Sequence, residues 1–559
     1  MTDPIKALIG ARRGYDVLRN PLLNKGSAFS PAERAALGLE GIVPPQFNDM
    51  NQQARRTYAN IQRQTTPIDK YVALASLQDR NEHLFYRLLT DHIEEFLPII
   101  YTPTVGQATR DFSRVFQRSR GVWITPMMRG RIAAALNHAA DGRPIRLIVA
   151  TDNESILGIG DQGAGGIGIS IGKLALYTAA AGVHPAQTLP ISLDVGTDNQ
   201  ALLDDPLYLG CREPRLRGAQ YDALIEEFVR AVMAEFPDAV LQWEDFRKEN
   251  ALTIMNRYRK VLPSFNDDIQ GTGAVALAGL LGSQRVSGRA LDDERIVVFG
   301  AGAGGLGIAR QIRAGFVQRG FDDVEIRARM AVLDSRGLIV ADNEIRDEYK
   351  RELAWSSSQA SSVGLGNAAN RTLADVVANF KPTVLIGASG QAGSFPEELI
   401  RQVAAHVERP VIFPLSNPND NSEARPEDIV RWTQGRAIVA AGSPFEPVEY
   451  GGSSRRIGQA NNAFIFPGLG LGTLLAQARE VTDAMISVAA ATLAGCLTDA
   501  EVAEGLLFPS VRRLRDVARE VAIAVVRQAT LEGVATKAIS DPEAAVSANM
   551  WAPVYPVFA

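Results

Sequence analysis

The pattern of apolar positions changes along the chain and predicts two kinds of structure. Between Thr66 and Leu89, apolar residues recur every three or four positions, as on one face of a helix. We expect residues 1–120 to be mostly helical, since they contain no strong strand pattern. From about residue 145, short apolar stretches at 145–150, 189–195 and 239–243 alternate with alanine-rich helical stretches. This alternation predicts a parallel sheet.

A second run of strands and helices follows Gly282. Five apolar stretches are typical of buried strands: 295–299, 330–334, 383–386, 411–414 and 437–440. Helical segments separate them, which predicts a doubly wound sheet. The chain returns to helix from about residue 470, and the serine-rich stretch 356–362 is expected to be a surface loop. The predicted fold class is α/β, with a helical N-terminal domain, a parallel-sheet domain and a Rossmann-type doubly wound domain.

The composition is that of an ordinary globular protein, but the chain is too long for one hydrophobic core. Its 559 residues are 46% hydrophobic and 22% charged, so several domains are expected. A net charge of −5 gives no support to binding of nucleic acid or of an anionic membrane. The first residues do not resemble a signal peptide, and the apolar stretch 274–281 is too short to span a bilayer. We expect a cytoplasmic protein with no nucleic-acid or membrane partner.

Histidine and cysteine are too scarce to suggest a zinc site. The chain has two cysteines and five histidines, and no two histidines have the spacing of a zinc-protease helix. Any metal is therefore expected to be a hard cation held by oxygen. Carboxylates occur in two pairs that can provide this oxygen, Glu244 with Asp245 after the predicted strand 239–243, and Asp267 with Asp268 before a helix. The alternatives are a helix cap by Asp268 or acid pairs on the surface.

A glycine turn after the strand at 295–299 predicts a dinucleotide site. Gly300, Gly302 and Gly305 form the G-x-G-x-x-G pattern at the start of a helix, where the backbone can approach a pyrophosphate. Asp334 ends the next predicted strand, where an acid can bond the adenosine ribose. The alternative is a glycine turn without a ligand.

A second turn of the same pattern, Gly158 to Gly163, competes with it. This turn contains Asp161, and the helix that follows carries Lys173, one of only nine lysines in the chain. Charged groups suit a substrate site better than a pyrophosphate site, and a buried lysine can serve as a base. A lysine exposed on the surface is the alternative.

Several longer motifs make the chain resemble a malic enzyme over nearly its whole length. They occur in the order of that family: Arg13–Gly26, Tyr101–Gly106, residues 265–281, Leu415–Pro418 and Asn461–Gly468. The resemblance implies oxidative decarboxylation of L-malate to pyruvate and CO₂, with reduction of NAD or NADP and with Mg²⁺ or Mn²⁺. It also implies a homo-oligomer, either a dimer or a tetramer.

The resemblance further implies a role for each site residue. Three carboxylates would hold the divalent metal: Glu244, Asp245 and Asp268. Lys173 would take the proton of the C2 hydroxyl, and Tyr101 would protonate C3 of enolpyruvate. Asn417 and Asn462 would contact the substrate, with Asn417 also at the cofactor.

The expected domains follow from the strands and the motifs. Residues 1–120 are expected to form the helical N-terminal domain. Residues 121–267 would form the catalytic domain, on which helices 463–535 would pack. Residues 268–462 would form the NAD(P)-binding Rossmann domain, and 536–559 a C-terminal tail.

Ser155 is a clear departure from the family pattern. Most members carry an arginine at this position, which pairs with a carboxylate of the substrate. Either malate binds weakly or another arginine takes its place, and the richness of the chain in arginine favours the second alternative. Malolactic enzymes are close relatives that also lack this arginine, and they convert malate to lactate with bound NAD. That activity is the alternative within the family.

The sequence leaves the choice between NAD and NADP open. Ser335 and Lys350 resemble residues of NADP-using members, whereas the charge of Asp334 opposes a 2′-phosphate. Arg336 and Lys350 can offset that charge, so the enzyme could use both NAD and NADP.

A hypothesis from another functional class is that the protein is a non-catalytic sensor of malate or NAD(P). The complete set of expected catalytic residues disfavours it.

Overall fold

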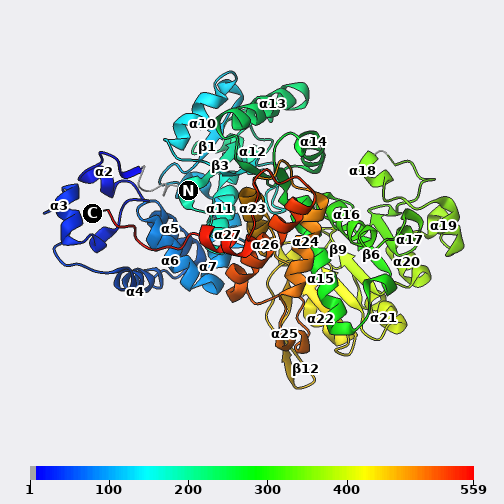
Figure 1. Cartoon of the computed structure of the whole chain (residues 1–559). Coiled ribbons are helices and arrows are strands. Elements are labelled where there is room, and N and C mark those ends of the chain that lie inside the picture. Colours follow the sequence, from blue (N-terminus) through cyan, green and yellow to red (C-terminus); the bar gives the residue numbers. More distant parts are fainter. Residues whose placement is uncertain (1–7, 346, 559) are drawn as a thin grey trace.

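Helices form the first part of the chain in the computed structural model, which describes residues 8–345 and 347–558 (Figure 1). They are α2 (Tyr15–Leu18), α3 (Pro31–Leu37), α4 (Met50–Ile61), α5 (Pro67–Gln78), α6 (Glu82–Asp91), α7 (Ile93–Ile100), α8 (Thr104–Arg110) and α9 (Phe112–Val115). The apolar pattern that begins at Thr66 covers two helices, α5 and α6. A new helix begins because the side chain of Asn81 caps it, accepting a hydrogen bond from the Leu84 amide.

A five-stranded parallel sheet follows, with strand order β1-β3-β2-β4-β5. Its strands are β1 (Val122–Ile124), β2 (Leu147–Thr151), β3 (Thr188–Leu193), β4 (Val240–Trp243) and β5 (Ser264–Asn266). Its helices are α10 (Ile132–Ala140), α11 (Ile167–Ala181), α12 (Gln200–Asp204), α13 (Gly218–Glu235) and α14 (Lys248–Tyr258). The three predicted strands are confirmed as β2, β3 and β4. The strands β1 and β5 were not predicted, because three residues are too few to show a pattern.

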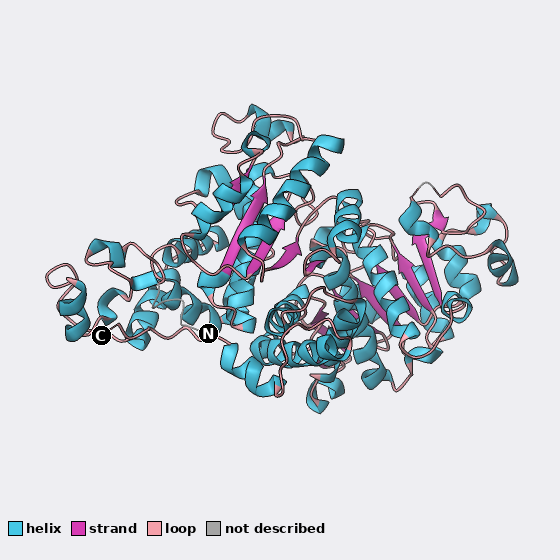
Figure 2. Ribbon diagram, turned by 45° about the horizontal axis from the view of Figure 1, so that its top comes forward, coloured by secondary structure: helices cyan, strands magenta, loops and turns pink. Residues whose placement is uncertain are grey.

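The second sheet has seven strands in the order β14-β11-β10-β9-β6-β7-β8, and Figure 2 shows it apart from the first. Its strands are β6 (Ile296–Phe299), β7 (Met330–Asp334), β8 (Gly337–Leu338), β9 (Val384–Gly387), β10 (Val411–Pro414), β11 (Ile438–Ala441) and β14 (Gly458–Gln459). The five predicted strands are confirmed as β6, β7, β9, β10 and β11. The chain runs from β6 to β7 on one side and later places β9 on the other. The carboxyl ends of β6 and β9 therefore form a switch point, where doubly wound sheets bind ligands.

Helices surround this second sheet: α15 (Thr272–Ser287), α16 (Ala303–Val317), α17 (Asp323–Arg327), α18 (Glu348–Arg351), α19 (Ser357–Ser362), α20 (Leu373–Phe380), α21 (Glu397–His406) and α22 (Pro426–Trp432). A small hairpin of β12 (Val448–Tyr450) and β13 (Ser453–Arg455) lies outside it. The expectation of a loop at 356–362 was wrong, because this stretch contains α19. Ser356 caps that helix by accepting a hydrogen bond from the Gln359 amide, and Ala360 is buried.

The last helices return to the first half of the chain. They are α23 (Phe466–Ala476), α24 (Asp483–Gly495), α25 (Asp499–Ala503), α26 (Leu514–Leu531) and α27 (Pro542–Asn549). α23 packs against α26 and α11. Close packing requires glycine, since a Cβ on Gly468 would come within 2.6 Å of Val521. The tail after α27 reaches the N-terminal helices, where Lys25 donates a hydrogen bond to the Pro556 carbonyl at 3.0 Å (Figure 1).

One segment within the described ranges, Gly163–Ala181, is long and apolar enough to cross a membrane by length and composition alone. It consists mainly of α11, which lies between the first sheet and the C-terminal helices. Of its most apolar window, 94% is buried inside the protein. Its apolar side chains are therefore part of the hydrophobic core.

Candidate active site

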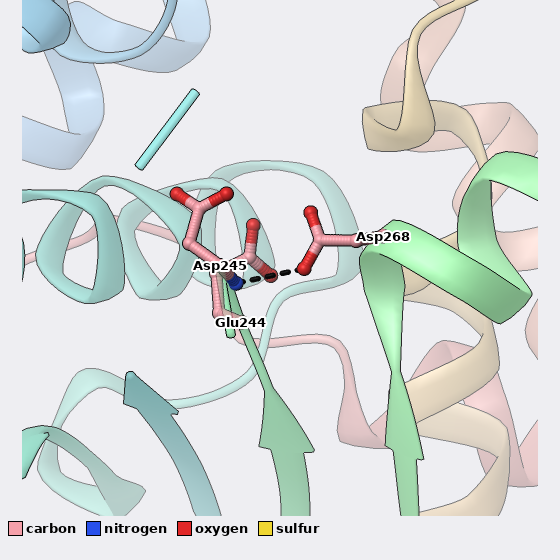
Figure 3. Close-up of side chains that lie close together, drawn as sticks. All are labelled: Glu244, Asp245 and Asp268. Atoms are coloured by element: carbon pink, nitrogen blue, oxygen red, sulfur yellow. Dashed lines mark hydrogen bonds between the residues drawn. The ribbon is translucent and has the colours of Figure 1, made fainter. Parts of the chain in front are cut away.

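Three carboxylates converge at the carboxyl edge of the first sheet. Glu244 and Asp245 directly follow β4, and Asp268 follows β5, its neighbour in the sheet. The chain between β5 and α15 forms one π-helical turn, Asp267–Gly271, which carries Asp268. The Asp245 amide donates a hydrogen bond of 2.7 Å to Oδ2 of Asp268 (Figure 3). One oxygen from each of the three carboxylates can be chosen so that all lie within 4.8 Å of one another.

The properties of these acids fit a divalent cation. Glu244 and Asp245 are buried, and Oδ2 of Asp245 is buried without a hydrogen-bond partner among the described residues. Burial, together with the charge of Asp268, raises the pKa of Asp245 well above its usual range. Burial also raises the pKa of Asp268 to about 6. Carboxylates that repel one another, one of them with an oxygen that accepts no hydrogen bond from a described residue, are the ligands that Mg²⁺ or Mn²⁺ would satisfy.

Lys173 lies beside this cluster, on the buried side of α11. Its Nζ is 2.8 Å from Oε1 of Glu244 and also contacts Oδ2 of Asp267. Burial opposes the ammonium form, but the carboxylates of Asp267 and Glu244 outweigh it and raise the pKa of Lys173 well above its usual range. The alternative of a surface lysine is wrong, because Lys173 is fully buried.

Tyr101 reaches the same place from the helical N-terminal part. It follows α7 directly and is buried, with the centroid of its ring 5.2 Å from Nζ of Lys173. Burial raises the pKa of the Tyr101 hydroxyl, so the tyrosine stays protonated at neutral pH. α11 can approach this residue because it carries a glycine beside it: a Cβ on Gly172 would come within 2.7 Å of the Ile100 carbonyl.

Asp267 and Asn462 complete the contacts around Lys173. Asn462, just before α23, donates a hydrogen bond of 3.0 Å to Oδ2 of Asp267. From the sequence, Asp267 is recognisable only as one of an acid pair, without a role. The signal for its position was Lys173 itself, because a buried ammonium requires nearby carboxylates. Asn417 lies on the loop after β10, and its carbonyl would be 3.2 Å from a Cβ on Gly158. The second glycine turn is therefore adjacent to this asparagine.

The first glycine turn has the geometry of a phosphate-binding turn. Gly300 has a φ of 113°, and a Cβ on it would come within 2.3 Å of the Ala388 carbonyl after β9. A Cβ on Gly305 would be 1.8 Å from the Gly300 carbonyl, so the helix start also requires glycine. α16 begins at Ala303, with Gly302 before it, so its free amides are directed to the switch point between β6 and β9.

Asp334, at the end of β7, is held by basic groups. Lys350 donates a hydrogen bond of 2.7 Å to its Oδ2, and the Arg336 amide donates one of 2.8 Å to its Oδ1. Burial opposes the charged form of Asp334, but these contacts outweigh it and lower the pKa of the carboxyl. Ser335 is exposed next to it.

The loop around Ser155 contacts three arginines through its acids. Arg217 is 2.7 Å from Glu154, and Arg247 is 3.8 Å from the same carboxylate. Arg215 is buried, and its Nη1 lies 3.1 Å from Asp161. Each guanidinium is thereby paired with a carboxylate of this loop. Which of the two alternatives holds at Ser155, a substitute arginine or weak binding of malate, stays a prediction.

Comparisons with known proteins agree with this architecture. The family model "Malic enzyme, N-terminal domain" matches residues 78–259, and the model "Malic enzyme, NAD binding domain" matches residues 269–530. The chain is 46% identical over 545 residues to "NAD-dependent malic enzyme 3" of Bacillus subtilis, a match that covers 97% of this chain and 96% of that protein. It is 43% identical over 557 residues to an "NAD-dependent malic enzyme" of Pseudomonas aeruginosa, with 99% of both chains covered.

Solved structures support the fold. The malic enzyme of Entamoeba histolytica matches with a TM-score of 0.58 at 21% identity, over 92% of this chain and 91% of that chain. The malic enzyme of Pyrococcus horikoshii matches with a TM-score of 0.54 at 24% identity, over 82% of this chain and 88% of that chain. The resemblance in the sequence motifs and the predicted α/β fold are confirmed. The chain belongs to the malic enzyme family.

Proposed function

We propose that this protein is a malic enzyme in activity as well as in family, and that it converts L-malate to pyruvate and CO₂ with reduction of NAD. The observation that carries the proposal is the contact of Lys173 with Glu244, one of three carboxylates that fit a divalent cation. A general base beside a metal site is what oxidation of a hydroxy acid followed by decarboxylation requires. The relatives named as NAD-dependent malic enzymes favour this activity over the malolactic one.

The proposed roles divide the proton transfers between two buried groups. Bound NAD would accept the hydride from C2, and Mg²⁺ or Mn²⁺ held by the three carboxylates would polarise the C2 oxygen. Lys173 takes the proton of the C2 hydroxyl. Asp267 contacts its Nζ and is itself held by a hydrogen bond from Asn462. Tyr101 donates a proton to C3 after CO₂ has left, because its raised pKa keeps it protonated. Two groups are needed, since one cannot easily be base on one side of the substrate and acid on the other.

Lys173 must lose its proton to act as a base. The high pKa of Lys173 depends on the negative charges of Asp267 and Glu244. A cation that neutralises Glu244 weakens this support and lowers the pKa of Lys173. Metal binding and activation of the base are thus coupled through one carboxylate.

NAD is the cofactor that the site favours. An ionised Asp334 accepts hydrogen bonds from ribose hydroxyls and repels a 2′-phosphate. Lys350 offsets that charge, but it is already bonded to Asp334. We therefore expect a preference for NAD with residual use of NADP.

Homo-oligomerisation, the cytoplasmic location and the domain borders remain predictions.

The experiment is an assay of NADH formation from L-malate and NAD with Mn²⁺, before and after chelation. We expect formation of NADH that stops on chelation and returns with Mn²⁺. Asp268→Asn should abolish it while NAD still binds, because one metal ligand loses its charge. Full activity of Asp268→Asn, or of the exhaustively chelated enzyme, would contradict the proposal.

A further inference from the structure

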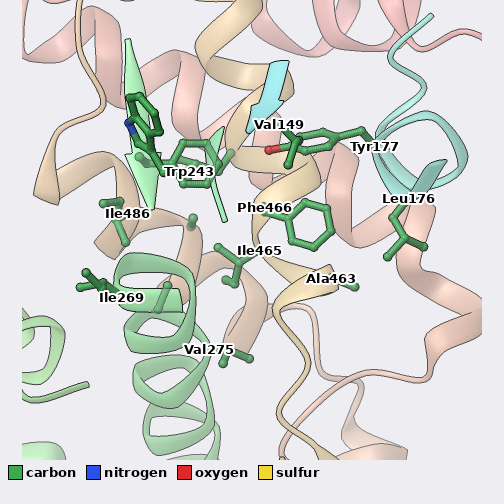
Figure 4. Close-up of a cluster of buried hydrophobic side chains, with 14 of the residues drawn as sticks. Val149, Leu176, Tyr177, Trp243, Ile269, Val275, Ala463, Ile465, Phe466 and Ile486 are labelled. Atoms are coloured by element: carbon green, nitrogen blue, oxygen red, sulfur yellow. The ribbon is translucent and has the colours of Figure 1, made fainter. Parts of the chain in front are cut away.

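Two polar residues that are hydrogen-bonded to each other lie in the hydrophobic core next to the acidic cluster. The hydroxyl of Tyr177 on α11 donates a hydrogen bond of 2.5 Å to Oε1 of Gln242 on β4. Both residues are fully buried, and Figure 4 shows Tyr177 beside the ring of Phe466 and among other apolar side chains. A buried carboxamide and a buried hydroxyl are costly unless they are paired, so their pairing at this position needs an explanation.

The spacing of helix and strand connects this pair to the acids. Side chains two residues apart on a strand point to the same face, so Gln242 and Glu244 face α11 together. Side chains four residues apart on a helix also share a face, and this relates Tyr177 to Lys173. The two spacings match, at about 6.6 Å along the strand and about 6 Å along the helix. Two contacts therefore form side by side, Tyr177 with Gln242 and Lys173 with Glu244.

The direction of the hydrogen bonds is fixed by the chemistry of the groups. Burial raises the pKa of Tyr177 well above its usual range, so its hydroxyl keeps its proton and donates it to Oε1 of Gln242. The amide nitrogen of Gln242 then faces the acid and donates a hydrogen bond of 2.7 Å to Oε2 of Glu244. The opposite orientation of the carboxamide would place its oxygen against a carboxylate oxygen. Glu244 therefore decides which end of the carboxamide faces it, and Tyr177 holds the other end.

Both carboxylate oxygens of Glu244 therefore have a partner within the protein. Lys173 contacts Oε1, and Gln242 contacts Oε2. Each carboxylate oxygen has a second lone pair, which stays available to a cation. Groups that bond the ligands of a metal fix their direction and raise metal affinity, even though they do not touch the metal.

We propose that Gln242, held by Tyr177, is a positioning residue that fixes the carboxylate of Glu244 for a divalent cation. This inference rests on the proposed function, since it assumes that the three carboxylates bind Mn²⁺ or Mg²⁺. It adds two fully buried residues from the core to the site, Gln242 and Tyr177. Without the donor of Gln242, Glu244 keeps only its contact with Lys173, and without Tyr177 the carboxamide of Gln242 is held at one end only.

The test is a titration of the whole protein with Mn²⁺, followed by the electron paramagnetic resonance signal of the free ion. Gln242→Met keeps the volume of the side chain and removes the donor. We expect it to weaken Mn²⁺ binding about 10- to 100-fold. Tyr177→Phe leaves Gln242 in place without its partner, and we expect a smaller loss in the same direction.

A matched control is available elsewhere in the core. Gln78 donates to the hydroxyl of Tyr86 at 3.4 Å, so the two form a second buried glutamine–tyrosine pair, in the N-terminal helices. Gln78→Met should leave Mn²⁺ affinity unchanged, even if it lowers the melting temperature. NAD binding, measured by fluorescence, should be unchanged in all three variants. A general loss of folding would reduce both affinities together.

The outcomes separate this inference from the proposed function. If wild-type protein does not bind Mn²⁺, the proposed function fails. If the wild type binds Mn²⁺ and Gln242→Met binds it equally well, the positioning role is wrong. If Gln242→Met does not fold, Tyr177→Phe decides in the same way, and wild-type affinity in that variant overturns the inference.

Discussion

Asn462 donates a hydrogen bond of 3.0 Å to the carboxylate of Asp267, although 195 residues separate them in the sequence. Asp267 in turn contacts the buried ammonium of Lys173. The C-terminal helices therefore do more than cover the first sheet, because the segment that leads into α23 contributes to the surroundings of the proposed base. A site built from such distant segments forms only when both parts of the chain have folded.

The proposed division of proton transfers predicts different losses for two variants. Tyr101→Phe removes the acid but no charge, so NAD and Mn²⁺ should still bind while turnover falls by roughly 10²–10⁴. Lys173→Met removes the base and should also leave Asp267 and Glu244 without a counter-charge, which lowers stability as well as activity. Turnover at saturating malate and the melting temperature distinguish the two effects. Near-normal turnover of Tyr101→Phe would show that another group protonates C3.

Ser155 predicts weak recognition of one substrate carboxylate. The arginines that contact its loop form ion pairs with the acids of that loop. We therefore expect no other guanidinium to compete with a new one at position 155 for the substrate carboxylate. We expect Ser155→Arg to lower KM for malate roughly 10- to 150-fold, the value of about 1.5–3 kcal/mol for a charge-assisted contact. Steady-state kinetics of Ser155→Arg and of Ser155→Gln, which adds bulk without charge, provide the comparison. A raised KM in the arginine variant would mean that another arginine already fills the role.

The contact between Lys350 and Asp334 predicts opposite changes in cofactor preference. Asp334→Ala removes the carboxylate and frees Lys350 for a 2′-phosphate, so the ratio of kcat/KM for NADP to that for NAD should rise. Lys350→Ala leaves the acid without its partner, so the same ratio should fall. Both ratios are measured with the two cofactors in parallel at one malate concentration. A change of this ratio in the same direction in both variants would contradict the proposed roles of Asp334 and Lys350 in cofactor preference.

His83 predicts a loss of stability in acid. It is buried beside Trp551, and burial, with the charges of His184 and Lys25, lowers the pKa of His83 to about 3. The unfolded chain binds a proton at about pH 6.5 and the folded chain does not, so stability falls as the pH drops from about 6.5 towards 3. At pH 5 the expected loss is about 2 kcal/mol.

Urea unfolding at pH 7 and pH 5 tests this expectation. His83→Phe should reduce the difference between the two pH values, and the exposed His138→Gln should not change it. An equal pH dependence in wild type and His83→Phe would rule out the buried histidine as the cause.

The sequence was sufficient for the parts of the site that follow from local pattern. Glu244 and Asp245 could be placed at the carboxyl end of a predicted strand, and Gly300 could be placed because its turn has a fixed spacing. Asp268 joined these acids only through the family resemblance, because the short strand β5 showed no pattern. Tyr101 and Asn462 were available only through the family resemblance, since helix packing brings them to Lys173. Gln242 and Tyr177 gave no signal, because a strand glutamine and a helix tyrosine have no motif of their own. The helix α19 was missed because its serines are typical of loops, and one of them is its cap.

The ratio of pyruvate to NADH is the most direct test of the proposed activity. The purified protein is incubated with L-malate, NAD and Mn²⁺, and pyruvate, lactate and NADH are measured in the same sample. An oxidative decarboxylase forms pyruvate and NADH in equal amounts and no lactate, and this is the result that we expect. Lactate without net NADH would show the malolactic activity, and binding of malate without any product would show a sensor.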